Sequence, residues 1–390
     1  MARVALKLVE SQQFSVEELN LPLKQGDSKV HSLHSLCSLP GDINPEIAEY
    51  CIERFSTPGQ LILDPFSGSG TVALQAALTG RDTIAADVNP IAIAYTLAKL
   101  KPADIAEVAL TLQLQSLSKP IALTNFDKYF SAFYDVNTYR EIVNLKDFIS
   151  ASPSRVVGFI SAVASSLLHG HGAGSFSSYT YSSISLSPTE QQALNIERGQ
   201  YPDYRSVQPR IFKKTASVMR DGYSTKLRSS KNAVFQTDAR NLSRVANGSV
   251  DLVVTAPPYI RSKQDLDNLW LKLWFSDVSR AELESALSGP KNLEEWLEFI
   301  NEVTFELARV VKPGGRVVFV FEELSKEYSQ QDLNRHQQLL LDFIDESLSS
   351  YWSSELSIKC LPPTPVISGA GRTRSKKEMQ EKNILVFRRR

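Results

Sequence analysis

The stretch Leu61-Ile62-Leu63-Asp64-Pro65-Phe66-Ser67-Gly68-Ser69-Gly70-Thr71 joins a short apolar run to a glycine-rich turn and then to the start of a helix-like segment. Its first four residues are typical of a buried strand, and residues 71–78 predict a helix. The same order repeats directly, because residues 83–88 predict a strand and residues 91–100 a helix. Strand, helix, strand and helix in this order predict a parallel sheet.

Strand-like runs return only after residue 232. Between the two blocks, residues 103–232 carry helical patterns and no sheet signal. We therefore expect an α/β fold, with a doubly wound sheet of seven strands that carries an inserted, mostly helical segment. The expected divisions are 1–102 and 233–390 for the two parts of the sheet domain and 103–232 for the insertion. The five later strands are expected at 233–238, 250–255, 316–321, 354–360 and 383–388.

The composition is that of an ordinary globular chain, with 390 residues, 42% of them hydrophobic and 22% charged. A net charge of zero excludes a uniformly basic coat for nucleic acid but leaves room for a local basic face. Three cysteines without Cys-x-x-Cys spacing and five histidines predict neither a metal site nor a disulfide framework. No apolar run approaches the ~20 residues of a membrane helix, and the N-terminal stretch lacks a signal-peptide core, so we expect a cytoplasmic protein.

The glycine-rich turn has a candidate chemical role. Between a strand and a helix, glycines let main-chain N–H groups approach a ligand closely. Asp87 ends the next predicted strand, 17 residues after Gly70, where a carboxylate suits the hydroxyls of a bound ribose. Taken alone this is a weak signal, because many tight turns use glycine and many strands end in aspartate.

A second element follows the predicted strand 250–255. Pro257 and Pro258 fix the backbone and remove two N–H donors, which leaves carbonyl groups on a rigid turn. Tyr259 offers a flat face at the carboxyl edge of the sheet, where ligands bind in open α/β folds. The alternative is a proline-terminated strand with a core tyrosine. That alternative loses weight because the glycine-rich turn and Asp87 are expected at the same edge.

Together, Asp64-Pro65-Phe66-Ser67-Gly68-Ser69-Gly70-Thr71 and Ala256-Pro257-Pro258-Tyr259 resemble the motifs of S-adenosylmethionine-dependent DNA amino methyltransferases. These enzymes modify N4 of cytosine or N6 of adenine, and many belong to restriction–modification systems. The resemblance covers residues 31–102, 233–323 and 372–389. It implies a Rossmann-like methyltransferase sheet, S-adenosylmethionine as cofactor and double-stranded DNA as partner, with a cognate restriction endonuclease as a further candidate partner. The order of the two motifs resembles the group whose target-recognition region lies between them.

The resemblance also implies roles for individual residues. By the family pattern, the glycine motif lines the methionine part of the cofactor, Asp87 holds the ribose and Asp238 reaches the adenine amino group. The segment from His34 to Pro45 resembles an element that closes over the cofactor. The implied cofactor-binding residues are Asp64, Phe66, Gly68, Gly70, Thr71, Asp87, Asn89 and Asp238, and the implied catalytic residues are Thr255, Ala256, Pro257, Pro258 and Tyr259.

Methylation of an exocyclic amine explains the second motif. The amine is a poor nucleophile until its N–H groups donate to the motif's first side chain and to the next proline carbonyl, and an aromatic ring stacks on the flipped base. Relatives usually begin the motif with Asp, Asn or Ser. Ala256 has no acceptor, so we expect Thr255 or the Pro257 carbonyl to replace it, and the lack of Asp favours N4 of cytosine over N6 of adenine. Methylation of carbon 5 would need a cysteine nucleophile in a Pro-Cys element, and none of the three cysteines has that setting.

Basic residues cluster within the predicted insertion. Residues 205–231 contain eight basic side chains against one acidic, and residues 372–390 contain eight against two. This polarity favours phosphate contact over a merely solvated face. The Gly-, Ser- and Tyr-rich patch 169–188 has two interpretations, a flexible loop or an adaptable surface that orders on a partner. The expected phosphate-binding residues are Arg210, Lys213, Lys214, Arg220, Lys226 and Arg228.

Two other functions stay open beside a DNA amino methyltransferase. RNA methyltransferases of the guanine-N2 type use a similar Pro-Pro-Tyr turn, although they usually carry an added RNA-binding module at the N-terminus. A catalytically silent relative that only binds nucleic acid is the other alternative, because Ala256 lacks the usual acceptor.

Overall fold

The computed structural model describes residues 15–20, 30–170, 172, 174–177, 179–181, 184–258, 266–287, 290, 292–321, 340–344, 346, 348–361 and 382–390. The predicted catalytic residue Tyr259 and most of the predicted basic tail, residues 372–381, lie outside this set.

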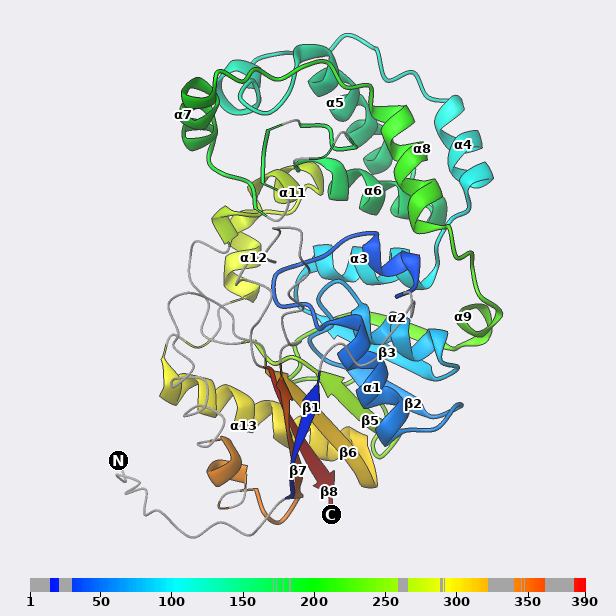
Figure 1. Cartoon of the computed structure of the whole chain (residues 1–390), viewed down its shortest axis with the longest axis vertical. Helices are drawn as coiled ribbons and strands as arrows, with labels where there is room; N and C mark the ends of the chain where they lie inside the picture. The colour runs from blue at the N-terminus through cyan, green and yellow to red at the C-terminus, as the bar shows by residue number, and fades with distance from the viewer. Residues whose placement is uncertain are drawn as a thin grey trace, which may run out of the picture.

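The described residues form one sheet of eight strands in the order β1-β7-β8-β6-β5-β2-β3-β4 (Figure 1). Only β8 runs antiparallel to its neighbours β6 and β7, and the other pairs in this sheet are parallel. This confirms the predicted doubly wound α/β fold. The strands are β1 (Ser15–Asn20), β2 (Leu61–Asp64), β3 (Asp82–Asp87), β4 (Asn232–Gln236), β5 (Val250–Thr255), β6 (Val311–Phe321), β7 (Trp352–Leu361) and β8 (Lys382–Arg389).

The predicted number of strands, seven, is one too few. All seven predicted strands are present, and β1 adds an eighth at the sheet edge, where it pairs with β7 alone. Its sequence, Ser-Val-Glu-Glu-Leu-Asn, has little apolar character, and Val16 is 69% exposed. An edge strand of this kind buries too little surface to leave a hydrophobic pattern in the sequence.

Helices cover both faces of the sheet, and the strands alternate their side chains between them. Val317 and Phe319 of β6 pack in the core that contains helix α13 (Leu293–Val310). Val318 and Val320 of the same strand pack in the opposite core, with α1 (Pro45–Phe55) and α2 (Thr71–Leu78). This alternation is the period-two pattern that a sheet buried on both faces requires.

The long segment between β3 and β4 is helical, as predicted. Figure 1 shows most of its helices gathered beyond one end of the sheet, with α11 and α12 beneath them. The helices after β3 include α3 (Pro90–Leu100), α4 (Ile105–Gln113), the short η2 (Phe126–Phe130), α5 (Val136–Ala151), α6 (Arg155–Leu167), α7 (Pro188–Arg198), α8 (Val207–Val218), α9 (Thr225–Ser229), α11 (Trp270–Phe275) and α12 (Arg280–Ala286). The short helix η1 (Ser32–Ser35) lies before α1.

The core of this helical part includes residues that come after the catalytic turn in the sequence. Leu271, Leu273 and Phe275 of α11 pack in one buried cluster with side chains of α5, α6 and α8. The predicted domain boundary at residue 232 lies where strand-like sequence returns. The helical core nevertheless contains side chains from both sides of this boundary. The division into 1–102, 103–232 and 233–390 stays a prediction.

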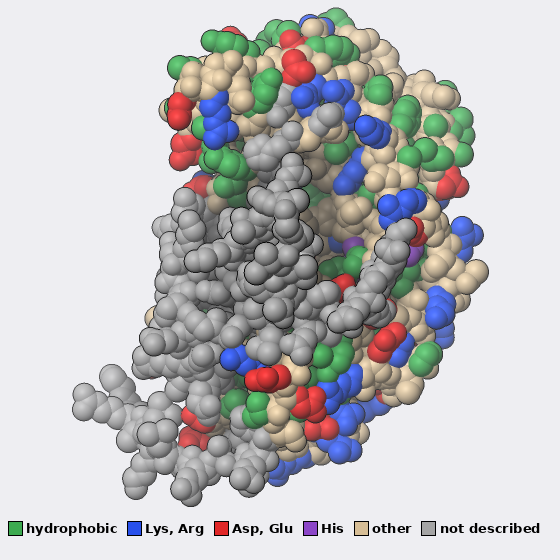
Figure 2. Space-filling model, viewed as in Figure 1, with side chains coloured by type: hydrophobic (Ala, Val, Ile, Leu, Met, Phe, Trp, Pro, Cys, Tyr) green, Lys and Arg blue, Asp and Glu red, His purple; other side chains and the backbone are tan. Residues whose placement is uncertain are grey.

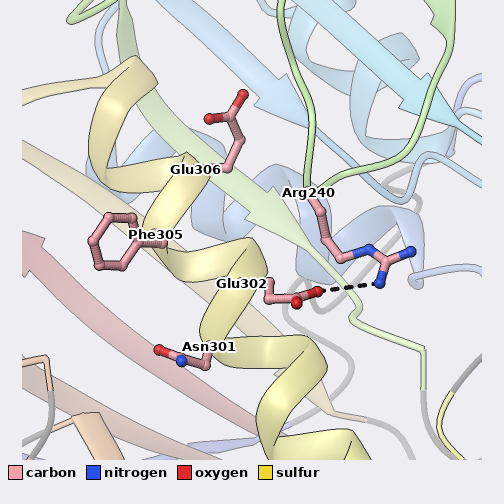
Figure 3. A pocket seen from close by; sticks show the side chains of 5 residues that line it. All are labelled: Arg240, Asn301, Glu302, Phe305 and Glu306. Atoms are coloured by element: carbon pink, nitrogen blue, oxygen red, sulfur yellow. Dashed lines mark hydrogen bonds and ion pairs between the residues drawn. The ribbon is translucent and has the colours of Figure 1, made fainter.

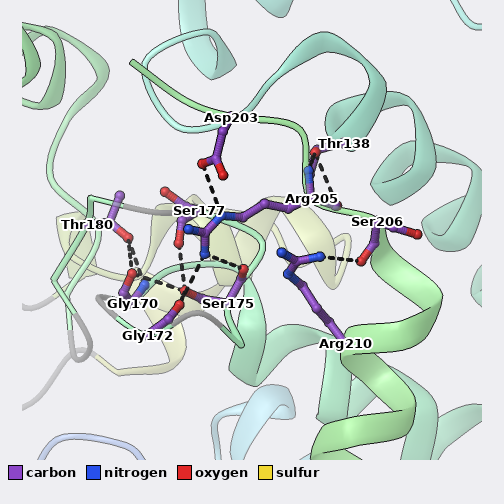
Figure 4. A network of polar contacts seen from close by, with 10 residues as sticks. All are labelled: Thr138, Gly170, Gly172, Ser175, Ser177, Thr180, Asp203, Arg205, Ser206 and Arg210. Carbon is purple, nitrogen blue, oxygen red and sulfur yellow. Dashed lines mark hydrogen bonds and ion pairs between the residues drawn. The ribbon is translucent and has the colours of Figure 1, made fainter. Parts of the chain in front are cut away.

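The described part of the Gly-, Ser- and Tyr-rich patch is held by a network of hydrogen bonds (Figure 4). The Ser175 hydroxyl lies within hydrogen-bond distance of the carbonyls of Gly170, Gly172 and Ser177. The Arg205 guanidinium, from the segment before α8, donates to the carbonyls of Gly172 and Ser175 at 3.1 and 3.2 Å. Arg205 belongs to the basic cluster found in the sequence. In the structure its side chain binds main-chain carbonyls of the same protein.

Candidate cofactor and catalytic site

The predicted site elements meet at the carboxyl edge of three neighbouring strands. β2 lies between β3 and β5 and is parallel to both, so the turn after β2, Asp87 at the end of β3 and the turn after β5 share one edge. In open α/β sheets this edge is where ligands bind. On the face drawn in Figure 2, the surface is hollowed between the helical part and the sheet part, with Lys and Arg side chains on the helical side.

Asp64 links the two motifs. Its carboxylate accepts the Thr255 hydroxyl at 2.6 Å and the Phe66 N–H at 3.2 Å. Burial raises the pKa of Asp64 to about 7, although the hydrogen bonds from Thr255 and Phe66 act in the opposite direction. The Thr255 hydroxyl is fully buried and acts as a donor in this bond. It is therefore poorly placed to accept a proton from a substrate amine.

Two positions of the turn require glycine, because neighbouring groups lie too close to leave room for a Cβ. Gly68 has φ +49°, and a Cβ there would lie 2.6 Å from Oδ1 of Asp42. Gly70 has φ +82°, and a Cβ there would lie 2.9 Å from the Cα of Thr96 on α3. Thr71, the first residue of α2, is buried directly behind them. The turn therefore packs against the Asp42 side chain at Gly68 and against the backbone of α3 at Gly70.

Asp87 fixes the turn to the next helix. Its carboxylate accepts the Gly68 N–H at 3.0 Å and the Asn89 N–H at 2.9 Å. Asn89 is the N-cap of α3, and its side-chain oxygen accepts the Ile91 N–H at 3.0 Å. Both predicted cofactor residues therefore have structural partners in the chain, and their contacts with a cofactor stay predictions.

Asp42 is a residue of this site that the sequence did not single out. Its carboxylate accepts the Ser69 N–H at 2.8 Å and the Ser69 hydroxyl at 2.6 Å, and it also accepts the Leu39 N–H at 2.7 Å. The buried Lys99 of α3 donates to the Ser69 hydroxyl at 2.7 Å. The segment from His34 to Pro45, expected to close over the cofactor, is thus joined to the glycine-rich turn through this carboxylate.

Asp238 lies after β4, where both of its carboxylate oxygens accept hydrogen bonds from the Arg240 guanidinium, at 3.0 and 2.8 Å. Burial would raise the pKa of Asp238, but the hydrogen bonds and charge of Arg240 hold it below its usual value. Arg240 also contacts Glu302 and lies over the ring of Phe299, which packs 5.9 Å from the ring of Phe66. A hollow of about 550 Å³ opens beside them (Figure 3), lined by Arg240, Asn301, Glu302, Phe305 and Glu306.

The described part of the predicted catalytic turn is held by packing and by one hydrogen bond to α13. Ala256 is partly buried and packs against the core on the α1 side of the sheet. The Pro258 carbonyl accepts the indole N–H of Trp296 on α13 at 2.9 Å. No hydrogen bond from any described residue reaches the carbonyl of the buried Pro257. The turn is therefore rigid and keeps one carbonyl without a described partner.

The six predicted phosphate-binding residues fall into two groups. Arg210 donates to the Ser206 carbonyl and Lys214 to the Ser35 carbonyl, and burial lowers the pKa of each. The other four side chains are exposed, although Lys226 borders a hollow that also contains three glutamates. The exposed residues are Lys213, Arg220, Lys226 and Arg228, and the three glutamates are Glu46, Glu49 and Glu53.

Comparison with known families agrees with the site. The model of the N6/N4-type family described as DNA methylase matches residues 17–98 and 250–379, more than half of the chain. The chain belongs to the DNA methylase family. This confirms the family that the two motifs predicted, a family of S-adenosylmethionine-dependent methyltransferases, and with it the predicted cofactor.

Individual relatives match over different extents. The chain is 32% identical over 85 residues, 22% of its length, to the type II methyltransferase M.MjaII of Methanocaldococcus jannaschii, and the match spans 16% of that protein. The rRNA methyltransferase aviRa of Streptomyces viridochromogenes is 11% identical with a TM-score of 0.33, and the match covers 94% of each chain. An rRNA methylase of Streptococcus thermophilus is 7% identical with a TM-score of 0.34, over 89% of this chain and 97% of that one.

The residues at the sheet edge fit S-adenosylmethionine on one observation. The Ser67 hydroxyl is buried and has no hydrogen-bond partner among the described residues, which is costly unless a ligand completes it.

The described residues contain no group of three or more His, Cys, Asp and Glu side chains that could hold a metal ion. Among the described helices, none combines the length and the apolar character needed to cross a membrane. The cytoplasmic location stays a prediction.

Proposed function

We propose that this protein transfers a methyl group from S-adenosylmethionine to the exocyclic amine of a base flipped out of double-stranded DNA. Within this activity, N4 of cytosine is favoured over N6 of adenine. The protein then acts in the cytoplasm as the modifying partner of a cognate restriction endonuclease. The relative M.MjaII is named a type II methyltransferase, which supports the link to restriction and modification.

The observation that carries the proposal is the hydrogen bond of 2.6 Å between Asp64 and Thr255. It joins the end of the strand before the glycine-rich turn to the end of the strand before Ala256. A cofactor held by the first turn and an amine held by the second would therefore meet at one edge. Holding two reactants in a fixed geometry lowers the barrier to transfer, because the entropy of bringing them together is lost on binding.

The preference for N4 of cytosine depends on the main chain of the catalytic turn. Ala256 offers no side-chain acceptor, and the Thr255 hydroxyl donates to Asp64. We infer that the Pro257 carbonyl accepts one proton of the amine and so increases the electron density on its nitrogen. Adenine-directed relatives usually begin the motif with Asp, and Ala256 departs from that pattern.

When bound, S-adenosylmethionine supplies the methyl group on a positively charged sulfur. The chain's part is to orient both reactants. Gly68 and Gly70 let the turn pack closely against Asp42 and α3, and Asp87 holds the Gly68 N–H in place while its carboxylate lies near the expected ribose. Phe66 is backed by Phe299, which supports it as a side wall of the cofactor site.

Mass spectrometry of nucleosides tests the proposal directly. The protein is expressed in a host whose DNA lacks both N4-methylcytosine and N6-methyladenine, and the DNA is digested and analysed. Wild type is expected to introduce N4-methylcytosine. Asp87→Ala should abolish the mark, because it removes the carboxylate that holds Gly68 and faces the ribose. Asp82→Ala, at the opposite end of the same strand, is the matched control and should retain the mark.

The outcomes separate the alternatives. N6-methyladenine instead of N4-methylcytosine would contradict the preferred base and leave the DNA activity standing. N2-methylguanine in the RNA, with unmodified DNA, would favour the RNA methyltransferase. Unmodified DNA and RNA would contradict the enzymatic proposal altogether.

A further inference from the structure

Helix α11 carries a lysine in an otherwise apolar run, Leu269-Trp270-Leu271-Lys272-Leu273-Trp274-Phe275. Lys272 is 6% exposed. No hydrogen bond or ion pair joins its ammonium to any described residue, and the ammonium lies 5.9 Å from the ring centroid of Tyr95. Burial of an ammonium is costly unless hydrogen bonds or an anion compensate it, so a ligand anion would stabilise Lys272.

Lys272 lies beside the cofactor turn. Tyr95 belongs to α3, where the adjacent Thr96 contacts Gly70, and Lys99 one turn later donates to Ser69. Helix α3 therefore contacts both the glycine-rich turn and Lys272. Burial lowers the pKa of Lys272, and the nearby Asp42 acts in the opposite direction.

The charges around this point do not balance. Burial raises the pKa of the Cys37 thiol to about 11. The charges of Lys99, Lys272 and Lys214 act to lower this pKa, and the charge of Asp42 acts to raise it. Three ammonium groups thus surround this buried thiol against one carboxylate. Asp42 already accepts three hydrogen bonds, from Ser69 and Leu39. Of these three ammonium groups, that of Lys272 is the one with neither a hydrogen bond nor an ion pair to a described residue, so a further anion would stabilise it most.

We propose that the ammonium of Lys272 binds the carboxylate of the methionine part of S-adenosylmethionine. This inference rests on the proposed function and adds a cofactor residue from outside both sequence motifs. The position fits, since Asp42, a charged neighbour of Lys272, lies against Gly68 in the turn expected to line that part of the cofactor. Because Leu271 and Leu273 belong to the helical core, the cofactor would also tie the helical part to the sheet.

The same chemistry could be supplied by a phosphate of the extruded nucleotide. The glycine-rich turn favours the cofactor, because the lysine and the turn share helix α3 as a support. The test below separates the two sources.

The experiment measures binding by calorimetry without DNA, using S-adenosylmethionine and its decarboxylated form, which lacks only the carboxylate. Lys272→Met keeps the apolar stem and removes the charge. We expect this variant to bind S-adenosylmethionine about tenfold to a hundredfold more weakly than wild type, the range for a lost hydrogen bond to a charged group. Decarboxylated S-adenosylmethionine should bind equally to both proteins. Lys101→Met, an exposed lysine at the end of α3, is the control and should bind like wild type.

Thermal unfolding of the unliganded protein gives a second readout. Lys272→Met should unfold at the same or a higher temperature than wild type, because it removes an unpaired buried charge. A lysine with a merely structural role would give a lower temperature.

Three results would overturn the inference. They are unchanged affinity of Lys272→Met for S-adenosylmethionine, an equal loss for the decarboxylated form, and a loss confined to DNA binding, which would assign the site to a phosphate. A wild-type protein that binds neither form of the cofactor would instead contradict the proposed function.

Discussion

The sequence indicates a functional role for both the glycine-rich turn 65–70 and the basic segment 205–231. The two differ in how far their side chains and backbone adopt the arrangement that such a role requires. In the turn, Gly68 and Gly70 each have positive φ and a neighbour that excludes a side chain. In the basic segment, Arg210 and Lys214 turn toward the chain's own carbonyls, whereas Lys213 is exposed.

The difference has a physical cause. A glycine motif between a strand and a helix is fixed by main-chain geometry, which the motif itself determines. The direction of a charged side chain depends on the packing of its helix against elements far away in the sequence. On α8 the buried residues Val207, Ile211 and Val218 mark the inner stripe, and Lys214 falls on the same stripe. Charge alone therefore identifies a basic segment but does not identify its outer face.

The largest effect is expected at Gly68. In Gly68→Ala, a left-handed backbone and a methyl group 2.6 Å from Asp42 should together cost about 2–5 kcal/mol. We expect this cost to appear as loss of S-adenosylmethionine binding in calorimetry. Gly59→Ala is the matched control, since Gly59 has φ +85° but nothing within 4 Å of its added Cβ. It should lose stability and keep its cofactor affinity. Equal affinity in the two variants would show that the contact with Asp42 does not shape the site.

The next largest effect is expected for Asp64. Its contribution to the free energy of unfolding depends on pH. Because its pKa in the folded protein is raised to about 7, the folded state retains a proton that the unfolded state releases. This contribution to stability is complete below about pH 4 and is lost as the pH rises through 7. It amounts to on the order of 2–4 kcal/mol. Urea unfolding of Asp64→Asn between pH 4 and 8 should show a flatter dependence of stability on pH than wild type. Parallel curves would contradict the raised pKa.

Thr255→Val separates the two candidate acceptors of the amine proton, the Thr255 hydroxyl and the Pro257 carbonyl. The substitution removes the hydroxyl that donates to Asp64, so we expect a loss of about 1–2 kcal/mol in the free energy of unfolding. The rate of methyl transfer should change less than tenfold, because the amine is expected to use the Pro257 carbonyl. A much larger fall in rate at unchanged stability would instead assign the acceptor role to Thr255.

The smallest effect concerns the basic segment, where two pairs of residues can be compared. Replacing the exposed Lys213 and Arg220 with Gln should flatten the slope of log affinity for DNA against log salt by about 2. Replacing Arg210 and Lys214, which turn inward, should leave the slope close to wild type. If both pairs flatten the slope equally, the inward side chains must rearrange on DNA. If neither does, the segment is a solvated face.

Much of the fold could be predicted because strands buried on both faces and a glycine motif leave short, regular patterns. β1 left none, since an edge strand with exposed side chains buries little. Asp42 could not be recognised either, because it reaches Ser69 across 27 positions and belongs to no repeating pattern. Lys272 did leave a signal, a single charge inside an apolar run, but its meaning depends on the charges that the fold gathers around it.

We propose above all that the turns after β2 and β5 together transfer a methyl group to a base amine. The most direct test incubates the purified protein with methyl-labelled S-adenosylmethionine and double-stranded DNA, then identifies the labelled nucleoside. We predict labelled N4-methylcytosine for wild type and an equal or greater yield for Ala256→Ser, which restores a side-chain acceptor. The claim is contradicted if both proteins bind cofactor and DNA yet leave every base unlabelled, the result expected of a silent nucleic-acid-binding relative.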